Sequence, residues 1–122
     1  EMARKRSTKK DKKQHLTREA LELVATHFRA MGDATRLELI QALMDGEKSV
    51  QDLSKITGMS QANVSKHLSL LADQGILAKR KEGLYSLYRV VDHTVYDLCN
   101  VVCKSISERY ARVQDEFLGS GI

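Results

Sequence analysis

The sequence predicts one mainly α-helical domain that carries a small β-hairpin. The chain of 122 residues is long enough for a single hydrophobic core. Proline is absent and glycine occurs only 7 times, which favours helices joined by short turns over a Pro-rich linker or a β-sandwich. Apolar residues recur at helical spacing over most of the chain, and only the segment around 76–91 has the pattern of strands.

Four helices are predicted before the hairpin, and each begins at a residue that commonly caps helices. Thr17 precedes the first helix, and Asp33 precedes the second. Ser49 and Asp52 have the spacing of a capping box at the start of the third helix, and Ser60 precedes the fourth. A glycine follows each predicted helix, at Gly32, Gly46, Gly58 and Gly75.

The third and fourth helices are short and are joined by a turn at Gly58, which is a helix-turn-helix pattern. Val50, Leu53 and Ile56 are expected on the buried side of the third helix. The buried side of the fourth helix is expected to hold Val64, Leu68, Leu71 and Ala72.

The segment after the fourth helix changes to the period of β-strands. Strands are predicted at 76–77 and 87–91, with a charged tip that contains glycine at 79–83. A hairpin directly after a helix-turn-helix is a wing, so the fold class is a winged helix-turn-helix of order α-α-α-α-β-β-α. The last helix is expected to begin at Asp92 or Thr94, because either residue can cap it.

A long apolar stripe follows along the last predicted helix. Its members recur at helical steps: Val95, Cys99, Val102, Ile106, Tyr110, Val113 and Phe117. The rest of the chain offers nothing to cover this stripe, so a second copy of the chain is expected to do so. The predicted homodimer uses the first and last helices, and the interface is expected to include Val95, Val102, Ile106, Tyr110 and Val113.

The entire positive excess of the chain lies in its first fifteen residues. Residues 1–15 carry a net charge of +5, whereas the remaining residues sum to −1. We therefore expect 1–15 to be a disordered basic arm, 16–118 to be the folded domain, and 119–122 to be a flexible tail. The arm is interpreted either as a contact for a polyanion or as a solvated terminus.

Three segments carry a family resemblance. They are Ala34-Thr35-Arg36-Leu37, Leu53-Ser54, and the run Ser60-Gln61-Ala62-Asn63-Val64-Ser65-Lys66-His67-Leu68-Ser69-Leu70-Leu71 followed by Gly75-Ile76-Leu77. On these residues the chain resembles the ArsR/SmtB family of winged-helix repressors over roughly residues 17–117. The resemblance implies a cytoplasmic homodimer that binds operator DNA, represses transcription, and leaves the DNA in response to a signal that is often a metal.

The fourth helix, by this resemblance the recognition helix, offers polar side chains that suit DNA. Six residues near its start are expected to contact DNA: Ser60, Gln61, Asn63, Ser65, Lys66 and His67. The amides of Gln61 and Asn63 can each pair with adenine in the major groove. From Ser60 up to Asp73 the sequence has no acidic residue, which would repel phosphate. The alternative interpretation is an ordinary solvated helix face.

The predicted wing carries three consecutive cations, Lys79, Arg80 and Lys81. Alternation along a strand turns Lys79 and Lys81 to one side and Arg80 to the other. At least one of these side chains is expected to reach the DNA backbone or the minor groove. The same residues would also protect an edge strand from aggregation.

Cys99 and Cys103 are the only cysteines and lie four residues apart on the last helix. Their Cβ atoms are expected ~5–6 Å apart, too far for an intrahelical disulfide. They are interpreted either as small packing residues of the stripe or as a site for a soft metal, a metalloid or an oxidant. The metal motifs that the resemblance implies are incomplete, because only Asp92 and Glu108 of a zinc set remain.

The sequence therefore predicts a repressor that binds double-stranded DNA sequence-specifically and is released by an unidentified signal. The alternative is a non-specific basic nucleic-acid-binding or nucleoid-associated protein, against which Gln61 and Asn63 argue. An enzyme is not expected, because no nucleophile with a base and an orienting group is visible. The short apolar runs and the lack of a disulfide framework favour a cytoplasmic location without membrane contact.

Overall fold

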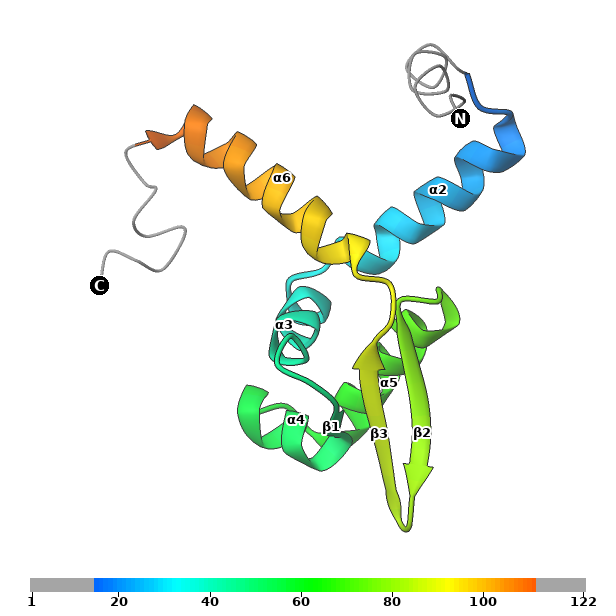
Figure 1. Ribbon diagram of the computed structural model, residues 1–122, viewed down its shortest axis with the longest axis vertical. Coiled ribbons are helices and arrows are strands. Elements are labelled where there is room, and N and C mark those ends of the chain that lie inside the picture. Colours follow the sequence, from blue (N-terminus) through cyan, green and yellow to red (C-terminus); the bar gives the residue numbers. More distant parts are fainter. Residues whose placement is uncertain (1–14, 112–122) are drawn as a thin grey trace, which may run out of the picture.

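The computed structural model describes residues 15–111 and confirms a winged helix-turn-helix fold (Figure 1). Its elements are α2 (Arg18–Met31), α3 (Ala34–Ala42), β1 (Lys48–Ser49), α4 (Val50–Thr57), α5 (Gln61–Asp73), β2 (Leu77–Glu82), β3 (Tyr85–Val90) and α6 (Thr94–Arg109). Helices α3, α4 and α5 and the sheet form a body, from one end of which α2 and α6 diverge (Figure 1). The basic arm before residue 15, Val113, Phe117 and the C-terminal tail lie outside the described residues.

Local capping fixes the starts of the first four helices as the sequence predicts. The side chain of Thr17 accepts a hydrogen bond from the Ala20 N–H, and that of Ser60 accepts one from the Asn63 N–H. Ser49 and Asp52 form the complete capping box, in which each side chain accepts from the other residue's backbone N–H. These bonds satisfy N–H groups that the first turn of a helix leaves without partners.

One hydrophobic core joins all the helices to the sheet. Val64, Leu68 and Leu71 are fully buried on α5, as predicted, so they hold the opposite face of this helix toward solvent. The prediction for Ile56 is wrong, because it is 54% exposed near the end of the short helix α4. Val95 is also fully buried; it packs inside the protomer and therefore does not belong to an exposed dimer face.

The sheet has the order β1-β3-β2, and all its pairs are antiparallel. Strand β1, which the sequence analysis did not predict, pairs Lys48 with Tyr88. The predicted charged tip is wrong in extent, because residues 79–82 are paired within β2. The hairpin turns at Gly83 and Leu84, and Gly83 supplies the positive φ of 63° that this turn requires.

Helix α6 begins at Thr94, one of the two predicted starts, but neither Asp92 nor Thr94 is its N-cap. His93 is the N-cap without a side-chain bond, and Asp92 instead accepts hydrogen bonds from both the N–H and the hydroxyl of Thr94. The Tyr96 hydroxyl donates to the Ile40 carbonyl at 3.1 Å and ties α6 to α3. Among the described elements, no helix is long and apolar enough to cross a membrane.

Candidate DNA-binding surface and thiol cavity

The exposed face at the start of α5 is the first candidate DNA-binding feature. The side chains of Gln61, Asn63 and Lys66 are exposed, whereas Ser65 and His67 are half-buried at the edges of this face. The Ser60 hydroxyl accepts from the Asn63 N–H at 3.2 Å, which leaves its own proton free to be donated. Because the buried residues of α5 anchor it in the core, these polar side chains are presented on a rigid element.

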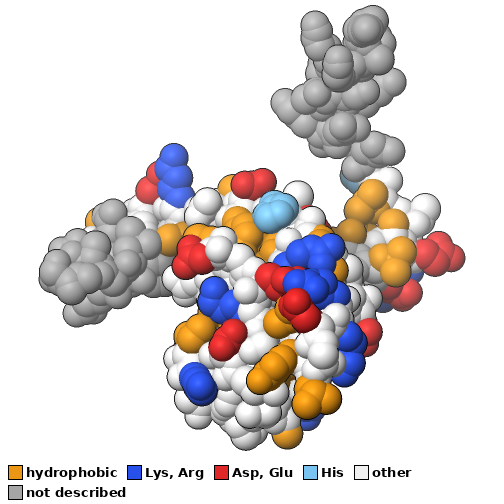
Figure 2. Space-filling model, turned by 60° about the horizontal axis from the view of Figure 1, so that its bottom comes forward, with side chains coloured by type: hydrophobic (Ala, Val, Ile, Leu, Met, Phe, Trp, Pro, Cys, Tyr) orange, Lys and Arg blue, Asp and Glu red, His pale blue; other side chains and the backbone are white. Residues whose placement is uncertain are grey.

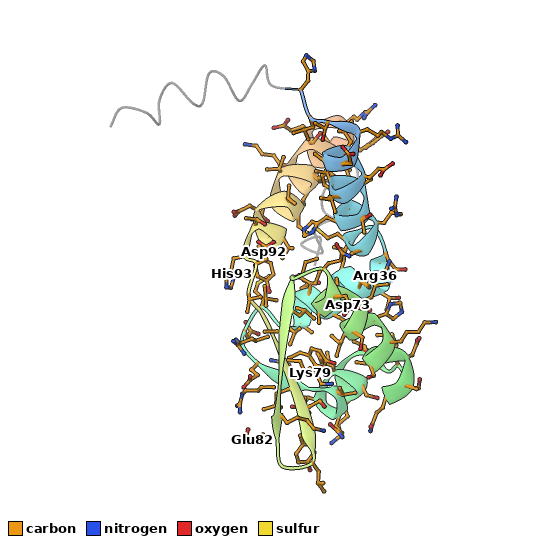
Figure 3. All side chains as sticks on the ribbon, turned by 90° about the vertical axis from the view of Figure 1, so that its right-hand side faces the viewer. Arg36, Asp73, Lys79, Glu82, Asp92 and His93 are labelled. Carbon is orange, nitrogen blue, oxygen red and sulfur yellow. The ribbon has the colours of Figure 1, made fainter. Side chains whose placement is uncertain are left out.

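The wing divides its three cations between two faces. Lys79 and Lys81 lie opposite Tyr88 and Ser86, and Tyr88 is a core residue, so both lysines leave the strand on its core-facing side. Glu82 and Lys79 lie on opposite sides of the hairpin in Figure 3. The alternation predicted from the sequence therefore separates Lys79 and Lys81 from Arg80.

Arg80 forms ion pairs with two carboxylates of the protein. Its Nε and Nη2 donate to the two carboxylate oxygens of Glu47, each at 2.8 Å, and Nη2 also donates to Glu82 at 3.2 Å. The hydrogen bond from Arg80 lowers the pKa of the Glu47 carboxyl. Two carboxylates thus lie against one guanidinium, whose side chain is still 47% exposed, and the DNA contacts of Lys79, Arg80 and Lys81 stay predictions.

His67 faces a residue that the sequence analysis did not select as functional. Its Nδ1 lies 3.2 Å from Nη1 of Arg36 at the start of α3. Arg36 also donates to carbonyls in the last turn of α2, so it bridges α2 to the recognition helix. Two signals were available: Arg36 belongs to a segment that carries the family resemblance, and it is a charged residue within the first turn of a helix, which by itself indicates only a solvated side chain.

Charges of both signs mix over the end of the molecule that carries the wing tip. Figure 2 brings this end forward and shows basic and acidic side chains side by side rather than one positive field. Residues 15–111 contain equal numbers of Lys or Arg and of Asp or Glu. Any general attraction to DNA must therefore come from local groups on α5 and the wing or from the basic residues before position 15.

Helices α2 and α6 expose apolar side chains although both belong to the folded unit. The exposed large residues are Leu21, Leu23, Val24 and Phe28 on α2, with Val101 and Val102 on α6 and Tyr110 just after it. Of the predicted dimer residues, Val102 and Tyr110 are each 54% exposed and Ile106 is half-buried. The two helices that carry these exposed apolar residues diverge at the end of the molecule away from the wing tip (Figure 1).

An apolar cavity of about 390 Å³ lies between the same two helices. Phe28 and Met31 line it from α2, and Cys99 and Cys103 line it from α6. Both thiols are free and half-buried; burial, with a smaller effect of Cys103, raises the pKa of Cys99. Within residues 15–111, no three His, Cys, Asp or Glu side chains gather closely enough to hold a metal ion.

Known proteins share this fold and sequence pattern. Residues 33–79 match the family described as bacterial regulatory protein, arsR family. An arsenical resistance operon repressor of Bacillus subtilis is 33% identical over 66% of this chain and 77% of its own length. The chain belongs to the ArsR family. A probable mercury resistance operon repressor of Streptomyces lividans is 40% identical over 63% of this chain, but the match spans only 62% of that repressor.

Solved structures of ArsR-type regulators agree with this assignment. The crystal structure of the antimony-specific transcriptional repressor AntR has a TM-score of 0.69 at 31% identity, covering 80% of this chain and 89% of that chain. A homodimeric winged helix-turn-helix DNA-binding domain from Mycobacterium bovis has a TM-score of 0.66 at 29% identity, covering 78% of this chain and 90% of that chain. The family and the fold are those of DNA-binding transcriptional regulators.

Proposed function

We propose that this ArsR-family chain is a cytoplasmic homodimeric repressor that binds operator DNA through α5 and the wing. The observation that carries the proposal is the exposed, acid-free start of α5, where Gln61 and Asn63 present amides on a helix anchored by its opposite face. Amides at these positions suit adenine in the major groove, whereas binding to the backbone alone does not require them. Relatives named as resistance operon repressors support repression as the outcome of binding.

Dimerisation through α2 and α6 places the two recognition helices for a symmetric operator. The exposed apolar residues of these helices, including Phe28 and Val102, supply a self-complementary patch for a two-fold interface. A structural neighbour is itself homodimeric. In such a dimer the two α5 helices read half-sites about one helical turn of DNA, or a multiple of it, apart.

Release from DNA is proposed to follow binding of a soft metal or metalloid by Cys99 and Cys103. Thiolates are the protein ligands that soft ions prefer, and similar proteins are named as mercury and arsenical resistance operon repressors and as an antimony-specific repressor. One protomer contributes two thiols to the cavity, so a third sulfur ligand would come from the partner or from solution. The raised pKa of Cys99 keeps its thiol protonated near neutral pH, so the ion must displace a proton.

The last turn of α2 provides a route from the cavity to the DNA-binding helix. Phe28 and Met31 line the cavity, while the carbonyls of Arg29 and Ala30 accept hydrogen bonds from Arg36. Arg36 in turn contacts His67 on α5. A ligand that displaces this turn would therefore shift the recognition helix and disturb the match to both half-sites.

Selection from a random pool of duplex DNA tests the DNA-binding proposal. We expect enrichment of a two-fold symmetric sequence, and we expect Gln61→Ala to lower affinity for it while sparing random DNA. Failure to enrich any sequence, with binding that depends only on salt, would favour the non-specific alternative. Removal of residues 1–15 tests the arm, because each lost phosphate contact flattens the salt dependence by about 0.9 in logarithmic slope.

A release assay on the selected operator tests the thiol site. Arsenite, antimonite, Hg²⁺ and Cd²⁺ are added separately to the parent and to the double variant Cys99→Ser/Cys103→Ser. We expect at least one ion to release the parent protein from the operator DNA while the double variant stays bound to it. Equal release of both proteins would mean that the sensor lies elsewhere and that Cys99 and Cys103 are packing residues.

A further inference from the structure

One arginine side chain connects three helices through four polar contacts. Arg36, whose side chain is 15% exposed, donates from Nε to the Ala30 carbonyl at 2.6 Å and from Nη2 to the Arg29 carbonyl at 3.1 Å. Its Nη1 lies 3.2 Å from His67 Nδ1 and 3.9 Å from the Asp33 carboxylate. Figure 3 shows Arg36 at the junction of α2 and α3, beside α5.

These contacts determine which of the two side chains donates the hydrogen bond between Arg36 and His67. The hydrogen bonds to the two carbonyls on α2 set the plane of the guanidinium. The nitrogen that faces the His67 ring, Nη1, is also the one nearest to the Asp33 carboxylate. A guanidinium has five N–H donors, has no acceptor and does not lose its proton in proteins. His67 Nδ1 must therefore be the acceptor, and the proton of the neutral ring must reside on Nε2.

The Nε2–H group of His67 is then available at the edge of the recognition face. His67 is half-buried and lies one turn after the exposed Asn63, next to Lys66. Within residues 15–111, Nε2 has no hydrogen-bond partner. A single N–H donor beside a lysine suits a phosphate oxygen, which accepts such bonds from many DNA-binding proteins.

We propose that Arg36 is a positioning residue that holds His67 as the Nε2–H tautomer, so that His67 donates this proton to a DNA phosphate. The proposal rests on the DNA-binding function proposed above. It assigns Arg36 a role without contact to DNA: the residue selects which ring nitrogen carries the proton and fixes the ring against α2. Because α2 also lines the thiol cavity, the same contact makes the donor sensitive to the position of that helix.

Two substitutions at His67 separate the two ring nitrogens. In His67→Gln the amide nitrogen can take the place of Nε2–H, whereas in His67→Asn the shorter amide can replace only the Nδ1 acceptor. We expect the Gln variant to bind operator within about twofold of the parent and the Asn variant to bind about tenfold more weakly, as for one lost hydrogen bond of about 1.4 kcal/mol. His27→Gln is the matched control, because His27 lies on α2 with its Nε2 4.0 Å from the Asp92 carboxylate, and we expect no change.

The imidazole nitrogen spectrum tests the tautomer without DNA. We expect ¹⁵N-labelled parent near neutral pH to show a protonated Nε2 and an unprotonated Nδ1 at His67, assigned by loss of the signals in His67→Gln. Arg36→Lys should mix the two tautomers and weaken operator binding several-fold in the parent background. The same change should have little further effect on operator affinity in the His67→Gln background. A general folding defect would instead lower the operator affinity equally in the two backgrounds.

Distinct results refute the inference and the underlying function. A proton on Nδ1 of the parent, or unchanged operator affinity in His67→Asn, would overturn the proposed role of Arg36. A parent protein that selects no operator would overturn the proposed function instead. The nitrogen spectrum needs no DNA, so it tests the role of Arg36 whichever result the selection gives. An Nε2–H signal that persists unchanged in Arg36→Lys would show that Arg36 does not set the tautomer.

Discussion

Truncation of Phe28 to alanine tests the proposed dimer interface most directly. Phe28 is 55% exposed in the protomer, and fully burying such a side chain stabilises by about 1.5–3 kcal/mol. The exposed part is therefore worth about 1–1.5 kcal/mol per copy, and about 2–3 kcal/mol per dimer, because a two-fold interface contains the residue twice. This corresponds to a rise of about 30- to 150-fold in the dimer dissociation constant.

Sedimentation equilibrium over a concentration series measures this constant, and circular dichroism checks that the variant remains folded. Leu84→Ala is the matched control, because Leu84 is 93% exposed but lies at the wing tip, far from α2 and α6 (Figure 1). We expect no change in its dimer constant. A Phe28→Ala protein that dimerises as tightly as the parent, or a similar loss in Leu84→Ala, would refute the assignment of the interface.

Three further predictions concern the DNA contacts, the wing and the thiols. In competition binding, Asn63→Ala should cost about 1–3 kcal/mol on operator and nothing on random DNA, whereas Lys66→Ala should weaken both; equal losses for Asn63→Ala would make it a phosphate contact. Because Arg80 lowers the pKa of Glu47, their pair stabilises the fold above the ordinary carboxyl pKa and is lost as the pH falls through the lowered value. Urea unfolding across that acidic range should therefore show a weaker pH dependence for Glu47→Gln than for the parent, and identical profiles would contradict the coupling. Because burial raises the pKa of Cys99, Cd²⁺ affinity measured by thiolate absorbance should rise from mildly acidic to mildly alkaline pH, and a flat profile would exclude Cys99 as a ligand.

The parts of the fold that depend on neighbours along the chain could be predicted from the sequence. Thr17, Ser49 and Ser60 cap helices as expected because a cap acts on N–H groups only three residues ahead. The inward face of α5 was equally predictable, since helical spacing alone puts Leu68 and Leu71 on one side. These local rules are enough to predict the helix-turn-helix and the exposed polar face of α5, which is the candidate DNA-binding surface.

Tertiary structure decided which partners the predicted functional side chains contact. Strand β1 has only two residues, too few for a strand pattern. Glu47 directly precedes this strand and accepts a hydrogen bond from Arg80, 33 positions away. The contact between Arg36 and His67 spans 31 positions, and the packing of α2, α3 and α5 brings it about. Spacing could place Val95 on the same stripe as Val102, but only the angle at which α6 leaves the body buries the first and exposes the second. Periodicity specifies the face of a helix on which a residue lies, whereas the partner that covers it depends on long-range packing, which no local pattern encodes.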